Sequence, residues 1–102
     1  MSGSATYHFT ARLWEHEGPS AWHFVTVPTD VSDEIADLTA GRSAGFGSVR
    51  VRVTVGDTTW DTSVFPDTKA AAYVLPVKKA VRVAERLSAD RDVEITLVVL
   101  AV

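Results

Sequence analysis

Val49-Arg50-Val51-Arg52-Val53-Thr54-Val55 places a valine at every second position and a polar residue between each pair. Successive side chains of a β-strand point to opposite faces of the sheet, so this alternation predicts a strand with one apolar face and one polar face. The stretch is the strongest strand signal in the chain. It predicts a β-rich fold whose core is built on the valines of residues 49–55.

Weaker signals of the same kind predict five further strands. Residues 7–13 alternate between apolar and polar side chains, and residues 21–27 follow a turn that contains Gly18 and Pro19. The first two strands are therefore expected to form a hairpin. The other three are expected at residues 58–65, 71–75 and 93–100.

Two short helices are expected between the strands. The first has Ser32 as its expected N-cap and ends at Gly41, with apolar residues at helical spacing between them. The second is expected from Pro76 to Leu87, because its apolar residues also recur at helical spacing. Gly45-Phe46-Gly47 is interpreted as part of a flexible connector into the alternating strand.

Both halves of the chain show the same order of strand, strand, proline, short helix and strand, with Pro28 matched to Pro76. This order predicts an internal duplication over residues 6–55 and 58–101 within a single domain, 1–102. Two such halves, related by an internal two-fold, would form a six-stranded double-split pseudo-barrel with few free strand edges. The predicted fold class is mainly β with two short helices.

Three stretches carry a resemblance to a known bacterial family. They are Gly45-Phe46-Gly47-Ser48-Val49-Arg50-Val51, Trp60-Asp61-Thr62-Ser63-Val64-Phe65-Pro66 and Tyr73-Val74-Leu75-Pro76-Val77-Lys78-Lys79-Ala80-Val81-Arg82. In order and spacing, from Tyr7 to Leu100, the chain resembles the domain of unknown function 1905 family. The resemblance implies a double-split β-barrel, the architecture also seen in dimeric AbrB-like transcription regulators and antitoxins. It implies no activity, because a shared fold does not transfer function.

Length, composition and charge narrow the class of protein. A chain of 102 residues fits one domain, and it has no apolar run of the length that spans a bilayer. No secretory signal is recognised at the N-terminus, so we expect a cytoplasmic protein. The lack of cysteine excludes disulfides and thiol chemistry. The net charge of −3 disfavours nucleic-acid binding, which leaves an AbrB-like DNA-binding regulator as the alternative function.

Motifs for catalysis or metal binding are not found. The sequence shows no nucleophile elbow, no Ser-His-Asp arrangement and no phosphate loop. His8, His16 and His23 lie on separate predicted strands and a turn, with no spacing that would bring them to one metal ion. We expect no catalytic residue, metal or cofactor, and an uncharacterised enzyme is the least favoured class.

Lys78 and Lys79 form the sharpest candidate site. Both are expected in the first turn of the second helix, where a positive charge opposes the helix dipole. Residues that break a local rule without compensation are candidates for function, and lysines beside free helix N–H groups would bind phosphate or carboxylate. The alternative is that the two lysines are solvated or pair with Asp61 or Asp67.

Other candidates surround this expected site. The side chains of Tyr73, Ser63 and Phe65 would wall a small pocket beside Lys79. Arg50 and Arg52 share the polar face of their strand, where they either line a groove or keep the surface soluble. The candidate ligand-binding residues are therefore Lys78, Lys79, Tyr73, Ser63, Phe65, Arg50 and Arg52. We expect a non-enzymatic binding module for a small anionic ligand or a protein partner, as a monomer or weak homodimer.

Overall fold

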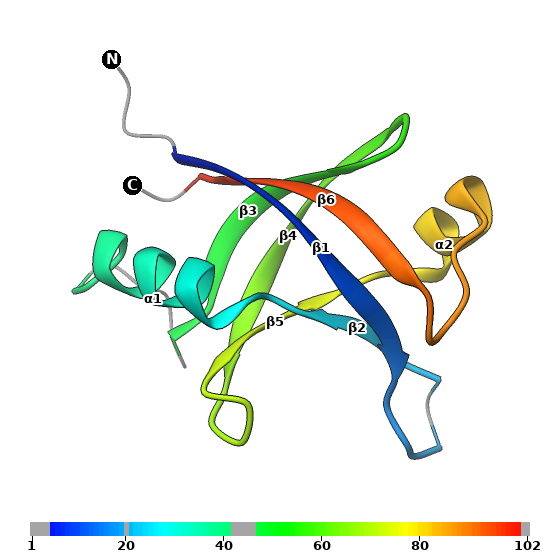
Figure 1. The fold of residues 1–102 in the computed structure, drawn as a ribbon, viewed down its shortest axis with the longest axis horizontal. Coiled ribbons are helices and arrows are strands. Elements are labelled where there is room, and N and C mark those ends of the chain that lie inside the picture. Colours follow the sequence, from blue (N-terminus) through cyan, green and yellow to red (C-terminus); the bar gives the residue numbers. More distant parts are fainter. Residues whose placement is uncertain (1–4, 20, 42–46, 101–102) are drawn as a thin grey trace.

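The computed structural model describes residues 5–19, 21–41 and 47–100, and within them six strands close into one antiparallel barrel (Figure 1). The elements are β1 (Ala5–Glu15), β2 (His23–Thr26), α1 (Thr29–Leu38), β3 (Val49–Val55), β4 (Thr58–Asp67), β5 (Ala72–Pro76), α2 (Lys79–Glu85) and β6 (Asp92–Val99). Around the barrel the strand order is β1, β2, β5, β4, β3 and β6. The prediction of a mainly β fold with two helices is confirmed.

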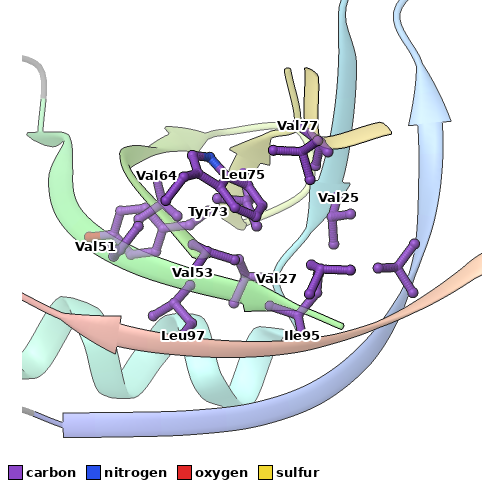
Figure 2. Close-up of a cluster of buried hydrophobic side chains, with 14 of the residues drawn as sticks. Val25, Val27, Val51, Val53, Val64, Tyr73, Leu75, Val77, Ile95 and Leu97 are labelled. Atoms are coloured by element: carbon purple, nitrogen blue, oxygen red, sulfur yellow. The ribbon is translucent and has the colours of Figure 1, made fainter. Parts of the chain in front are cut away.

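β3 carries the alternating valines, and they form the middle of the core. The four valine side chains point into the barrel and none is more than 5% exposed, whereas Arg50 and Arg52 are exposed on the outer face. Val53 lies opposite Trp60 of β4 on one side and Leu97 of β6 on the other. All six strands contribute side chains to the core, and Figure 2 shows several of them meeting in the interior. Each such side chain stabilises the fold by about 1.5–3 kcal/mol relative to an exposed one.

The two longest strands each change partner along their length. β1 pairs with β6 over residues 5–12 and with β2 over residues 13–15. β4 pairs with β3 over residues 58–64 and with β5 over residues 65–67. Each of these strands therefore diverges from one neighbour, and the space left beside it has to be covered by a helix, by side chains or by solvent.

The helices lie on opposite sides of the barrel (Figure 1). α1 packs closely: Ile35 is fully buried, and the buried Ser32 hydroxyl donates to the Val27 carbonyl at 3.2 Å and accepts from the Tyr73 N–H at 3.0 Å. α2 is shorter, and Val81 is its buried residue. Within the described residues neither helix has the length and hydropathy needed to cross a membrane.

The predicted ends of the first helix are wrong. α1 begins at Thr29 with Pro28 at the N-cap, and Ser32 is the fourth residue of the helix rather than its cap. The reason is that proline favours the start of a helix, while the Ser32 hydroxyl is used in a contact with β5. The helix ends at Leu38, and of the connector predicted between Gly41 and Gly47, residues 42–46 lie outside the described residues.

The second helix is shorter than predicted at both ends. Pro76 still belongs to β5, where it lies opposite Phe24, so the helix cannot begin there. It ends before Leu87 because Arg86 has a left-handed backbone, with φ of 55°. β4 also extends through Pro66 and Asp67, predicted as a loop, since both residues pair with β5.

The bonds of Ser32 predict that Ser32→Ala destabilises the fold. Removal of the hydroxyl leaves the buried Tyr73 N–H without its acceptor, which costs about 1–3 kcal/mol. Urea unfolding followed by circular dichroism measures this loss. Ser88→Ala, at an exposed position, is the matched control and should stay within about 0.5 kcal/mol of the parent chain. Equal stability of the two variants would contradict the role given to Ser32.

Candidate functional site

A pocket of about 430 Å³ lies where β4 diverges from β5. The ladder between these strands covers only residues 65–67 of β4, so the segment from Trp60 to Thr62 borders the gap. Residues 76–79 and Arg82 form the opposite wall, and residues 21–23, before and at the start of β2, close one end. The pocket is thus a direct product of the partner change in β4.

Two indole rings give the pocket apolar walls. Trp60 belongs to the core and is 9% exposed, whereas Trp22 is 56% exposed. The Trp22 ring stacks on Phe24, with centroids 6.1 Å apart and planes inclined by 13°. Phe24 in turn lies 5.1 Å from the ring of Trp14, which is fixed by a hydrogen bond from its Nε1 to Thr26 Oγ1 at 2.9 Å. Trp22 is therefore the outer member of a row of rings.

Three cationic residues line the same pocket. Lys78 is the N-cap of α2, Lys79 is its first residue, and both are exposed. Arg82 is half-buried and its Nε donates to the Val77 carbonyl at 3.2 Å, so the guanidinium is anchored by one of its donors. Within the described part of the chain none of the three forms an ion pair.

Asp61 is the one acidic residue among those lining this pocket, and it is already paired. Arg52 donates to both of its carboxylate oxygens, from Nε at 2.7 Å and from Nη2 at 3.1 Å. The hydrogen bond from Arg52 lowers the pKa of the Asp61 carboxyl. Because Arg52 balances this negative charge, Lys78, Lys79 and Arg82 leave the pocket with a net positive character.

Contacts at both ends hold α2 in place beside the gap. At its N-terminal side the Val77 N–H donates to the His23 carbonyl at 2.9 Å. At its C-terminal end Glu85 accepts a hydrogen bond from Thr58 Oγ1 at 2.6 Å. Gly56, in the turn before Thr58, has φ of 57°, and a Cβ atom there would collide with the Glu85 carboxylate. The position of the cationic wall thus depends on the β3–β4 turn as well as on β5.

The predicted site residues are only partly brought together. Lys78 and Lys79 share the pocket, as described, and neither pairs with Asp61 or Asp67. Tyr73, by contrast, is 8% exposed and lines a separate hollow beside α1. The structure does not bring Tyr73, Ser63 and Phe65 together beside Lys79.

The outer face of β3 and β4 holds the remaining candidates. Phe65 is 43% exposed, and the Arg50 guanidinium donates to Ser63 Oγ at 3.4 Å. Arg50 and Arg52 point away from the barrel interior, and Arg52 reaches the pocket only through its pairing with Asp61. Neither arginine lines the pocket itself.

Of the predicted site residues, Lys78 and Lys79 are the two that line the pocket, and among the lining residues that were not anticipated are Trp22 and Arg82. Arg82 lies three positions after Lys79 and four after Lys78, which is the spacing of side chains on one face of a helix. That spacing could have identified it. Trp22 was placed in a predicted strand, but β2 begins at His23, so its ring is free to lie outside the ladder.

No group of metal-ligating side chains occurs within the described ranges of the chain. His8, one of the histidines considered above, instead has its Nδ1 within hydrogen-bonding distance of Thr96 Oγ1, at 3.0 Å.

The family model described as Domain of unknown function (DUF1905) matches residues 9–97, which includes the pocket on all its sides. A search of curated proteins finds no match.

The ion pair at the pocket predicts a pH-dependent contribution to stability. The pKa of Asp61 in the folded chain lies below its ordinary value of 3.8, so the pair stabilises the fold above that pH. This stabilisation is lost as the pH falls through the lowered pKa. Thermal unfolding of the parent chain and Asp61→Asn should therefore differ more at pH 7 than at pH 3. Asp57→Asn, in the same hairpin, is the control, and a difference for Asp61→Asn that does not change with pH would contradict the assignment.

Proposed function

This chain belongs to the domain of unknown function 1905 family, whose description assigns no activity, and we propose from the pocket itself that the protein binds a small organic anion. The single observation that carries the proposal is the set of three cationic side chains that have no ion-pair partner among the described residues, gathered from α2 and its N-cap on one wall of an aromatic pocket. The protein acts as a binding module rather than as an enzyme.

The balance of charge supports an anionic ligand. Lys78, Lys79 and Arg82 outnumber the single acid of the pocket, and that acid is balanced by Arg52. α2 has only seven residues, so the support comes from these side chains rather than from the helix dipole. A carboxylate or phosphate group would be attracted to this wall.

The apolar walls and the volume support an organic ligand rather than a bare inorganic ion. The rings of Trp22 and Trp60 border the space, and ligand pockets typically have volumes of roughly 300–1,000 Å³ and mainly apolar linings. An ion of the size of sulfate would leave most of such a space to water. A molecule with an apolar body and one acidic group matches both walls.

We also propose that the barrel is a double-split barrel formed by internal duplication. The order strand, strand, helix, strand occurs twice, and the cyclic strand order is unchanged when β1, β2 and β3 are exchanged with β4, β5 and β6. Both helices follow the N-caps Pro28 and Lys78, which suggests that Pro28 corresponds to Lys78 rather than to Pro76. This correspondence supports the AbrB-like architecture as well.

DNA binding remains the alternative function, and it has less support. The arginines exposed on β3 do not form a free basic face, because Arg52 is paired with Asp61. The net charge of −3 also opposes association with a polyanion. A DNA-binding regulator would show an affinity for duplex that falls steeply with added salt.

We propose that the binding unit is a monomer. In the described barrel every strand has a neighbour on both sides, so one chain closes the sheet without a partner. Exposed rings such as Phe65 would be the contact points of a protein partner or a weak homodimer.

The proposal predicts that small organic anions bind and that the lysines contribute to affinity. Isothermal titration calorimetry with hexanoate, cyclohexanecarboxylate, benzoate and phenyl phosphate should detect binding by at least one of these probes. Lys78→Ala combined with Lys79→Ala should weaken it by roughly fivefold, because each exposed ion contact contributes a modest free energy. Added salt should weaken binding further.

Lys69→Ala is the control, because Lys69 is exposed in the turn between β4 and β5 and does not line the pocket. It should leave the affinity unchanged. Failure of every acid to bind, or equal binding by the double lysine variant and the Lys69→Ala control, would overturn the proposal.

A further inference from the structure

The geometry points to a planar aromatic acid as the ligand, with its ring stacked on Trp22 and its carboxylate or phosphate bound by the two terminal nitrogens of Arg82. This inference rests on the proposed function and narrows it from organic anions in general to one chemical class. It depends on two features of the pocket that are independent of the lysines.

The first feature is the free surface of Trp22. One face of its indole is covered by Phe24, since the two rings are nearly parallel. Phe24 does not line the pocket and Trp22 does, so the surface that Trp22 presents there is not the covered face. At 56% exposure this is a large apolar surface in contact with water. A planar ring placed against it would extend the row Trp14, Phe24 and Trp22 by one member, which is a favourable arrangement for aromatic rings.

Trp60 provides a second indole in the same pocket, on the side of β4. It is mostly buried, so it forms a fixed wall, whereas Trp22 is held mainly through Phe24. Its Nε1 forms no hydrogen bond within the described residues, where no buried side-chain nitrogen or oxygen lacks a partner, so this N–H retains access to solvent.

The second feature is the anchored guanidinium of Arg82. Its Nε is committed to the Val77 carbonyl, which orients the planar group. Within the described ranges its two terminal nitrogens have no protein partner. An anchored fork of this kind matches the two oxygens of a carboxylate or phosphate, whereas a lysine ammonium binds as a point charge.

The two helices differ at their fourth residue, and this difference leaves the pocket open beside α2. The fourth residue of each helix donates to the carbonyl of the valine that precedes the N-cap: Ser32 to Val27 in α1, and Arg82 to Val77 in α2. Ser32 is small and buried, and it also bonds to β5, so α1 lies close to the sheet. The long Arg82 side chain occupies the corresponding position in α2. It places a positive charge at the pocket, whereas Ser32 holds α1 against β5.

Three matched probes separate the ring from the charge. They are 2-naphthoate, its saturated analogue decahydro-2-naphthoate, and the neutral 2-naphthamide, with 2-naphthyl phosphate added to distinguish phosphate from carboxylate. We expect 2-naphthoate to bind about two- to tenfold more tightly than the saturated acid, because aromatic pairs contribute beyond their buried area. The neutral amide should bind about tenfold more weakly, because it lacks the charge-assisted hydrogen bonds.

The three tryptophans provide a direct readout of where the ring lies. Each indole N–H gives one signal in an NMR spectrum of the ¹⁵N-labelled chain. Bound 2-naphthoate should shift the signals of Trp22 and Trp60 through its ring current. The signal of Trp14 should move least, since its N–H is bonded to Thr26 and its ring lies beyond Phe24.

Two variants with matched controls test the named contacts. Trp22→Leu should remove the preference for the aromatic acid, whereas Phe65→Leu, at another exposed ring, should retain it. Arg82→Lys should weaken 2-naphthoate by about tenfold, because it keeps the charge and loses the fork. Arg86→Lys, one turn further along the chain and outside the pocket, should leave it unchanged. Thermal unfolding of each variant checks that it is folded.

The outcomes distinguish this inference from the proposed function. If the saturated acid binds as tightly as 2-naphthoate, or if Trp22→Leu keeps the preference, the aromatic class is wrong and the anion site stands. If Arg82→Lys binds 2-naphthoate like the Arg86→Lys control, the role of Arg82 is wrong and the anion site stands. If 2-naphthamide binds as tightly as 2-naphthoate, negative charge does not contribute and the proposed anion site fails as well. If no acid binds, both proposals fail.

Discussion

The change of partner within β4 is the constraint on which the rest of the site depends. A strand has two edges, and β4 uses one of them for β3 over most of its length before it joins β5 over residues 65–67. The barrel can close only because β4 and β1 both behave in this way. Where β4 has left β5, backbone and side chains border a space that the sheet itself does not fill. The pocket exists because β4 separates from β5 within a sheet that still closes into a barrel.

The sequence-based predictions succeeded where the signal was local and periodic. The valines of residues 49–55 predicted β3 correctly, because alternation is a property of the strand itself. The ends of the helices were wrong because tertiary contacts decide them. Pro76 stays in β5 because Phe24 lies opposite it, and Ser32 is drawn into α1 by its bonds to Val27 and Tyr73.

The candidate site was predictable only in part, for the same reason. Lys78 and Lys79 stand out in the sequence because they open a helix with positive charge. Arg82 and Trp22 have no such local mark. The importance of Arg82 comes from the position of α2 beside the gap, and that of Trp22 from its stacking on Phe24. Tyr73 was expected to wall the pocket beside Lys79, yet its ring contributes to the core.

Glu85 links the far end of α2 to the hairpin of β3 and β4, through Thr58 and against Gly56. The cationic wall therefore lies at the N-terminal end of a seven-residue helix whose C-terminal end contacts the turn between β3 and β4. A side chain at position 56 would strain a backbone with φ of 57° and would push the Glu85 carboxylate away from Thr58. The hairpin of β3 and β4 therefore contributes to the placement of α2, although Gly56, Thr58 and Glu85 do not line the pocket.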